Sequence, residues 1–261
     1  MVSFAALQVR SPPMLRLIIN ADDLGYSPSV NRAIFGWMER GKLSSATLIA
    51  NAPGLDDALA RVADFPGASF GVHLNVEEFA PLRPHPDLAP LLDEQGRFAR
   101  RLRATRRSPG LLRAVYGEWC AQIEALRAGG VRLSHLDSHH HAHNLPEMLP
   151  LLAALRRRYG IRCARVTMNL FEPAERKPIR VRALKGLYNV ALRGACGFRT
   201  TAAFAFLRTA FHLEPGRLER CGTVELMSHP GHPGFEDETR LLDTLEEGLP
   251  PHRLITYDEL A

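Results

Sequence analysis

The chain has 261 residues, 46% of them hydrophobic, and a formal net charge of +5. This length suits one α/β barrel whose core is large enough to fold without disulfides. No apolar run approaches the roughly 20 residues that span a bilayer, and the arginine-rich segments lack the interleaved aromatic residues of a single-strand nucleic-acid binder, so we expect neither a transmembrane segment nor nucleic-acid binding.

The first part of the chain alternates short apolar runs with helical patterns. Strands are predicted at residues 15–20, 46–51 and 69–74, and helices at residues 28–40 and 55–63. Ser27 and Pro28 supply an N-cap and a first-turn proline to the first helix, and Gly41 is placed to end it. This alternation predicts parallel βαβ units.

Residues 77–110 interrupt the alternation with five prolines, an acidic turn and a basic run. They are predicted to form a long loop or a small insertion. Long loops in compact domains are commonly functional, so we expect this one to form a lid or a wall of a substrate pocket.

The alternation resumes after this insertion. Helices are predicted at residues 111–128, 146–159, 181–193, 201–207 and 237–247. Strands are predicted at residues 133–136, 163–167, 223–227 and 253–256. Residues 171–178 are predicted to form another loop. The whole pattern indicates an α/β fold, with residues 14–261 forming one domain.

The cysteines and the first residues of the chain indicate the cellular compartment. The four cysteines are widely spaced: Cys120, Cys163, Cys196 and Cys221. Without a CxxC pair they argue against a cysteine-based zinc site and favour unpaired thiols in a reducing cytoplasm. Residues 1–13 lack the basic start and long apolar core of a signal peptide, so we expect them to form a disordered extension.

Residues 134–143, Ser-His-Leu-Asp-Ser-His-His-His-Ala-His, contain five of the eleven histidines. Histidine is the commonest metal ligand and the usual proton carrier near neutral pH. His139 and His143 have the i, i+4 spacing of a helical two-histidine metal motif, but the preceding strand and Pro146 favour a loop. In a loop, one or two imidazoles would reach a metal while the others orient the ligands through hydrogen bonds.

Polar side chains stand at the ends of four predicted strands. They are Asp22 with Asp23, His73, His139 and His229. Because active sites of α/β sheets and barrels lie at the carboxyl ends of the strands, we expect these groups to converge. Adjacent carboxylates at a strand end point in opposite directions unless the backbone turns, so one could bind a metal while the other faces water.

Each of these residues also has a purely structural interpretation. Asp22 and Asp23 could be acidic residues favoured by a helix dipole, and His73 could be a core histidine with satisfied hydrogen bonds. His229 could bind the backbone at its strand end. Held by the following proline and glycine, however, it would be rigid enough to serve as a general acid.

The same segments resemble the YdjC-like family of carbohydrate deacetylases. The matching blocks are residues 19–25, 30–31, 71–74, 135–143 and 225–231, in order along the chain. The resemblance runs from about residue 15 to the end and implies a distorted (β/α) barrel of the glycoside hydrolase/polysaccharide deacetylase type. Residues 77–110 depart from the family pattern, which leaves the identity of the sugar open.

The resemblance also implies a reaction. One divalent metal ion, Mg²⁺ or Zn²⁺, would be held by Asp23, His73 and His139. Asp22 would be the general base and His229 the general acid. The enzyme would remove the N-acetyl group of an N-acetylated amino sugar, in an oligosaccharide or a glycolipid, giving acetate and a free amine. The family further implies a homodimer, and a glycolipid substrate would bring peripheral membrane contact.

Two other functions fit the same residue types. A metal-dependent phosphoesterase on a similar barrel also uses aspartate and histidine, but it commonly holds two metal ions. A binding module or a metal-stabilised structural protein would need no general base. Asp22 stands beside a complete set of metal ligands and could be such a base, which argues against this third function.

Overall fold

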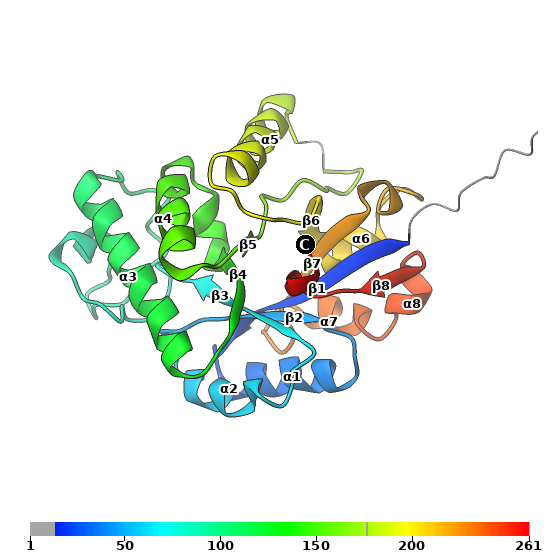
Figure 1. Cartoon of the computed structure of the whole chain (residues 1–261), viewed down its shortest axis with the longest axis horizontal. Coiled ribbons are helices and arrows are strands. Elements are labelled where there is room, and N and C mark those ends of the chain that lie inside the picture. The colour runs from blue at the N-terminus through cyan, green and yellow to red at the C-terminus, as the bar shows by residue number, and fades with distance from the viewer. Residues whose placement is uncertain (1–13, 176, 261) are drawn as a thin grey trace, which may run out of the picture.

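The computed structural model describes residues 14–175 and 177–260, so the extension expected at residues 1–13 lies outside the described residues (Figure 1). A sheet of eight strands forms the centre: β1 (Leu15–Leu24), β2 (Ser45–Leu48), β3 (Ser69–Leu74), β4 (Leu133–Ser138), β5 (Cys163–Ala164), β6 (Ala203–Phe206), β7 (Thr223–Ser228) and β8 (His252–Leu254). The strand order is β5-β4-β3-β2-β1-β7-β6, with β8 also paired to β1, and every pairing is parallel.

The two edges of the sheet approach each other. Ala164 N donates a hydrogen bond to Arg199 O, and Asn169 N donates one to Phe204 O, over 3.1 and 3.2 Å. These contacts join the segments around β5 and β6, which stand at opposite ends of the strand order. The sheet is therefore strongly curled, and the α/β class with a barrel-like parallel sheet is confirmed.

Helices cover the outside of this sheet (Figure 1). They are α1 (Pro28–Glu39), α2 (Leu55–Val62), α3 (Pro109–Ala128), α4 (Leu149–Tyr159), α5 (Ile179–Gly194), α6 (Leu207–Phe211), α7 (Glu236–Leu241) and α8 (Leu245–Gly248). Ser27 Oγ accepts a hydrogen bond from Val30 N and Pro28 occupies the first turn of α1, as predicted. None of the helices in the described part of the chain is long and apolar enough to cross a membrane.

Short 3₁₀ segments occupy several connections: η1 (Pro86–Leu91), η2 (His139–Asn144), η3 (Pro146–Met148), η4 (Glu219–Cys221) and η5 (Tyr257–Glu259). The first of them lies within residues 77–110, where a bridge between Leu92 and Phe98 adds a small local pairing. The predicted loop is therefore partly structured.

Strand alternation decides what faces the inside of the curl. On β1, Leu17 and Ile19 belong to the main core, whereas Ile18 joins a separate small cluster with Cys163 and Tyr257. Because three strands lie between β1 and β5 in the sheet, a cluster that contains both Ile18 and Cys163 must extend across the concave side. The concave side thus begins with an apolar layer near the start of the strands.

Beyond this layer the inward-facing positions are polar. Buried polar side chains at these alternate positions are Asn20, Asp22, Thr47, His73, His135, Asp137, Arg165 and Glu225. Gly71 faces the His135 ring so closely that a Cβ atom there would lie 2.5 Å from His135 Cε1. The interior of the curl is therefore a packed polar layer that leads to the carboxyl ends of the strands.

Several of the predicted elements differ from the structure: β1 is longer than predicted, β5 has only two residues, and the helix predicted at 146–159 begins with η3. Residues 201–207, predicted as a helix, contain strand β6, and α6 begins only at Leu207. Ala203 and Phe204 are fully or nearly fully buried and pair with β7, so tertiary pairing outweighs the local helical preference. The helix predicted at 237–247 is divided into α7 and α8.

Candidate active site

The backbone of β1 changes direction at the paired aspartates. Both residues lie inside the strand rather than after it, and the register against β2 shifts between Ala21 and Leu24. Asp23 has a left-handed backbone, with φ at 68°. The regular alternation of a strand would send Asp22 and Asp23 to opposite faces, so this bulge is what brings both carboxylates to one cavity.

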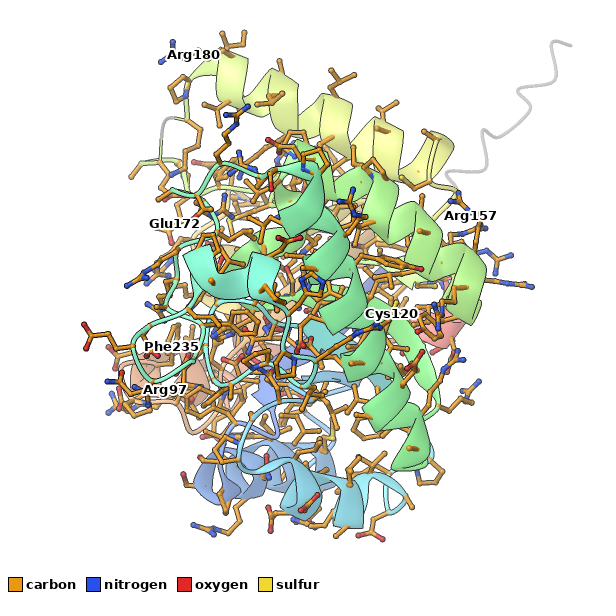
Figure 2. The ribbon with its side chains drawn as sticks, turned by 90° about the vertical axis from the view of Figure 1, so that its left-hand side faces the viewer. Arg97, Cys120, Arg157, Glu172, Arg180 and Phe235 are labelled. Atoms are coloured by element: carbon orange, nitrogen blue, oxygen red, sulfur yellow. The ribbon has the colours of Figure 1, made fainter. Side chains whose placement is uncertain are left out.

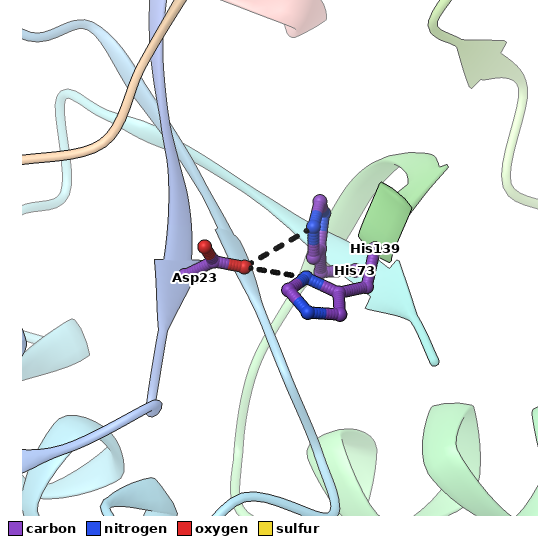
Figure 3. Close-up of side chains that lie close together, drawn as sticks. All are labelled: Asp23, His73 and His139. Atoms are coloured by element: carbon purple, nitrogen blue, oxygen red, sulfur yellow. Dashed lines mark hydrogen bonds and ion pairs between the residues drawn. The ribbon is translucent and has the colours of Figure 1, made fainter. Parts of the chain in front are cut away.

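Three of the predicted site residues meet directly (Figure 3). Asp23 Oδ1 lies 3.3 Å from His73 Nε2 and 2.9 Å from His139 Nδ1, and all three side chains are buried. They come from β1, β3 and the segment just after β4. The ends of three strands thus place one carboxylate and two imidazoles around a common point, as the sequence predicts.

The far nitrogen of each imidazole is held by another carboxylate. His73 Nδ1 lies 2.7 Å from Asp137 Oδ1, and His139 Nε2 lies 3.2 Å from Glu78 Oε2. A carboxylate on the outer nitrogen is typical of metal-binding histidines because it fixes the ring and its tautomer. Asp23, His73 and His139 therefore form a group that could hold a metal ion.

The charge around His139 fits a cation as well. Burial lowers the pKa of His139, but the carboxylates of Asp23 and Glu78 outweigh burial and raise it to about 10. The same anionic field that holds a proton on this imidazole would favour a divalent cation beside Asp23. Binding a metal there requires that proton to leave, so affinity should fall at low pH.

Asp22 is fixed by a buried arginine. Arg165 Nη2 and Nη1 donate to the two oxygens of Asp22 over 2.6 and 2.7 Å, and Asn20 Nδ2 donates over 2.8 Å. Burial by itself raises the pKa of Asp22, but the guanidinium of Arg165 overcomes this and holds the pKa well below its usual range. Asp22 is thus a rigid carboxylate, ionised at neutral pH, whose Oδ2 lies 3.9 Å from His73 Nε2.

Arg165 serves two further carboxylates inside the curl. It lies 2.7 Å from Asp137 and donates to Glu225 over 2.8 Å, and all of these groups are fully buried. Burial raises the pKa of Glu225 to about 7 even with this cation beside it. Because Asp137 also binds His73, one arginine connects Asp22 to the group that could hold a metal ion.

His229 faces the same cavity from the end of β7. Its Nδ1 lies 3.1 Å from Glu238 Oε2, which also accepts a hydrogen bond from the His229 backbone. Burial lowers the pKa of His229, but the Glu238 hydrogen bond and the charges of Asp22 and Asp23 outweigh burial and raise it. His232 adds a further imidazole, with Nε2 3.3 Å from Asp23 Oδ2.

The histidines of the histidine-rich segment make different contacts. His140 and His141 have left-handed backbones, with φ of 49° and 54°, so the segment is not a regular helix. His143 Nδ1 lies 2.5 Å from Ser138 Oγ, and His135 stacks on Tyr257 in the interior. Of the five imidazoles, only His139 lies against Asp23, and how many of them bind a metal stays a prediction.

These groups line one open cavity of about 600 Å³. Such a volume is typical of sites for small-molecule ligands. Phe206, Met227 and Phe235 form apolar parts of its wall, and residues 77–110 contribute Glu78 and Arg100. The expectation that this long loop forms part of a pocket wall thus agrees with its position.

Several side chains of the site were not predicted. Arg165, Glu78, Glu238 and His232 all contact predicted site residues. Arg165 gave the clearest signal, because a charged residue in the apolar run at 163–167 requires a buried partner. The partners of the others depend on how separate loops meet, which their sequence positions do not indicate.

Comparison with known proteins identifies the family. Residues 16–254 match the family model described as YdjC-like protein. The chain belongs to the YdjC-like family. The resemblance seen in the sequence blocks is therefore confirmed over nearly the whole YdjC-like chain, which includes every predicted site residue.

Curated relatives of this YdjC-like chain carry the name carbohydrate deacetylase. The protein from Geobacillus stearothermophilus is 37% identical over 147 residues, which are 55% of this chain and 57% of the relative. The protein from Brevibacillus brevis is 35% identical over 151 residues, or 56% and 58% of the two chains. The chain therefore matches little more than half the length of these relatives.

A solved structure has a fold similar to that of this YdjC-like chain. It is the crystal structure of an Enterococcus faecalis protein described as a candidate cellobiose-phosphate cleavage protein. The TM-score is 0.73 at 25% sequence identity, and the match covers 95% of this chain and 99% of that one. The curled sheet and its helices are therefore shared across almost the full length of both proteins.

Proposed function

We propose that this protein is a metal-dependent carbohydrate N-deacetylase. It removes the N-acetyl group of an N-acetylated amino sugar and gives acetate and a free amine. The observation that carries the proposal is the placement of the fixed carboxylate of Asp22 beside the metal-capable group of Asp23, His73 and His139 in one cavity. The names of the curated relatives support the choice of a carbohydrate substrate.

Asp23, His73 and His139 would hold the divalent ion, Mg²⁺ or Zn²⁺. When bound, such an ion polarises a carbonyl group and makes water more acidic. The protein's own contribution is geometric, since Asp137 and Glu78 fix the two imidazoles. Imidazole nitrogen is a typical donor to Zn²⁺ and carboxylate oxygen to Mg²⁺, so this mixed set of donors leaves the choice between the two ions open.

Asp22 would act as the general base. Arg165 and Asn20 hold both of its oxygens, so the carboxylate keeps one orientation toward the cavity. It takes a proton from the water molecule whose oxygen forms the new bond to the acetyl carbon. Low mobility favours this positioned proton transfer, and the carboxylate is ionised and able to accept the proton, although its lowered pKa makes it a weak base.

His229 would act as the general acid. The Glu238 hydrogen bond and the charges of Asp22 and Asp23 raise its pKa, which favours the protonated imidazole, and Glu238 fixes the ring. It gives a proton to the sugar nitrogen as the carbon–nitrogen bond breaks, so the amine leaves as a neutral group. One water molecule is consumed, and its oxygen ends in acetate.

An acetate-release assay tests the proposed function. Purified protein supplied with Zn²⁺ or Mg²⁺ is expected to release acetate from an N-acetylglucosamine oligosaccharide, and chelation with EDTA should abolish the release. Metal analysis is expected to give one equivalent per chain. Two equivalents together with release of phosphate from a phosphoester would instead favour the phosphoesterase and contradict the deacetylase.

Replacing His229 with glutamine is expected to slow acetate release by about 10²–10⁴-fold, because a neutral amide cannot donate the required proton. The alkaline limb of the wild-type pH profile reports loss of the imidazolium, so it should disappear in the variant. A pH–rate profile of both proteins checks this. His212→Gln, at an exposed histidine outside the cavity, is the matched control and should keep the wild-type profile. An unchanged alkaline limb in His229→Gln would assign the acid to another group.

A further inference from the structure

Helix α5 exposes an unusual amount of apolar surface. It carries four of the six large hydrophobic side chains that are exposed within the described residues: Ile179 at 84%, Leu184 at 59%, Leu187 at 66% and Val190 at 64%. The last three recur at intervals of three residues and therefore share one helix face. Tyr188, Asn189 and Leu192 form the buried side of the same helix. The helix thus has two apolar sides, and one of them faces solvent.

The charge on α5 is of one sign. The helix contains Arg180, Arg182, Lys185 and Arg193 and no acidic residue. Arg180 and Arg182 are exposed in the first turn of the helix, next to the exposed apolar face, whereas Arg193 donates hydrogen bonds to Thr200 Oγ1 and Thr201 O. An apolar face bordered by basic side chains is typical of helices that lie in the interface of an anionic membrane.

The end of the neighbouring helix α4 extends this basic border. Its last turn contains three consecutive arginines, of which Arg157 and Arg158 are exposed. A Cβ atom at Gly197, just beyond α5, would lie 3.2 Å from the guanidinium carbon of Arg156, so the two helix ends are in contact. Figure 2 shows α5 across one side of the molecule, with Arg180 at one end and Arg157 near the other.

Helix α5 also contacts the histidine-rich segment that lines the catalytic cavity. Tyr188 OH donates a hydrogen bond to the backbone oxygen of His143, in the histidine-rich segment. The loop before α5 lines a second cavity of about 510 Å³, and Phe206 forms part of the wall of both cavities. The exposed face of α5 therefore lies on an element that borders the approach to the site.

We propose that α5 docks on the surface of an anionic phospholipid bilayer. Leu184, Leu187 and Val190 enter the boundary between headgroups and acyl chains. The exposed guanidinium groups of Arg180 and Arg182 bind lipid phosphates. Docking would hold the catalytic cavity beside the membrane, so the substrate class becomes an N-acetylated sugar attached to a lipid. This substrate assignment rests on the proposed deacetylase function, whereas the docking itself does not.

A second copy of the chain fits this face less well. A twofold contact would place the same surface against itself, so two helices with four basic residues each and no acidic one would meet. Like charges opposed in this way weaken an interface. An anionic bilayer satisfies the apolar face and the basic border together.

Vesicle flotation tests the proposal. The wild-type protein is expected to float with vesicles of 70% phosphatidylcholine and 30% phosphatidylglycerol and not with pure phosphatidylcholine vesicles. The double variant Leu184→Gln/Leu187→Gln is expected to lose at least tenfold in the bound fraction. Leu82→Gln, at an exposed leucine outside α5, is the matched control and should bind as the wild type does. Arg180→Gln/Arg182→Gln should lower binding to the anionic vesicles only.

Three results would overturn the proposal. They are equal flotation with both kinds of vesicle, undiminished binding by the leucine variant, and a wild-type dimer that this variant converts to a monomer. Circular dichroism and acetate release from a water-soluble N-acetylated oligosaccharide check that the variants fold, since none of these positions touches the catalytic groups. If the wild type floats but releases no acetate, docking stands and the deacetylase function fails.

Discussion

Replacing Asp22 with asparagine is expected to lower acetate release by about 10²–10⁴-fold, the range typical of positioned proton transfer. The amide keeps the shape of the carboxylate and can still accept a hydrogen bond from Arg165, but it does not take up the proton of the attacking water. Asp23, His73 and His139 are unchanged, so the variant should still bind one metal ion per chain. Steady-state kinetics and metal analysis on the same preparation measure both expectations.

Asp23→Asn is the matched control for Asp22→Asn because the two residues are adjacent and both are buried. The control variant is expected to lose metal and activity together, while Asp22→Asn should lose activity alone. Asp22 Oδ2 lies 3.9 Å from His73 Nε2, so participation of Asp22 in metal binding is a concrete alternative. Loss of metal in Asp22→Asn would demonstrate that alternative, and activity within tenfold of wild type would exclude Asp22 as the base.

The convergence of the site residues could be predicted from the sequence because it follows from sheet topology. Parallel strands place their carboxyl ends at one edge, so polar residues after apolar runs must lie near one another. His73 and His139 meet Asp23 for this reason. The contacts are distant in sequence, since 64 residues separate His73 from Asp137 and 116 separate Asp23 from His139.

The remaining features depend on contacts that local patterns do not encode. The left-handed conformation of Asp23 arises from a bulge against β2, and non-glycine residues adopt it at a cost that only the surrounding structure can offset. Glu78 reaches His139 from a loop whose path a propensity argument does not give. Strand β6 was predicted as a helix because a short apolar run looks alike in both elements until its partner strand is known.

Removal of the Arg165 guanidinium is expected to have the largest effect on stability. In Arg165→Met, the carboxylates of Asp22, Asp137 and Glu225 would share a buried space without a cation. Breaking a buried ion pair from one side costs about 3–5 kcal/mol, because the remaining charges stay desolvated and unpaired. Urea unfolding at pH 7.5 measures the loss, with Arg157→Met on the exposed end of α4 as the matched control, expected to lie within about 0.5 kcal/mol of wild type.

The pH dependence of that loss separates electrostatics from packing. In the wild type the folded pKa of Asp22 lies below its unfolded value, so its contribution to stability is present above about pH 4 and is lost as the pH falls further. Without Arg165, burial is the largest remaining influence on Asp22 and Glu225 and raises their folded pKa values above the unfolded ones. The folded variant then takes up protons first, so its stability relative to wild type should recover as the pH falls from 7.5 to 5.

A deficit that is the same at both pH values would mean that Arg165 acts mainly by filling space. Arg165→Lys distinguishes these cases if the methionine variant does not fold. Lysine restores a positive charge, but the three donors of its single ammonium nitrogen cannot reproduce the two-point pairing with Asp22 together with the contacts to Asp137 and Glu225, which the five donors of the planar guanidinium provide. A lysine variant that recovers stability but not activity would show that the charge holds the fold, whereas the paired hydrogen bonds to Asp22 orient the base.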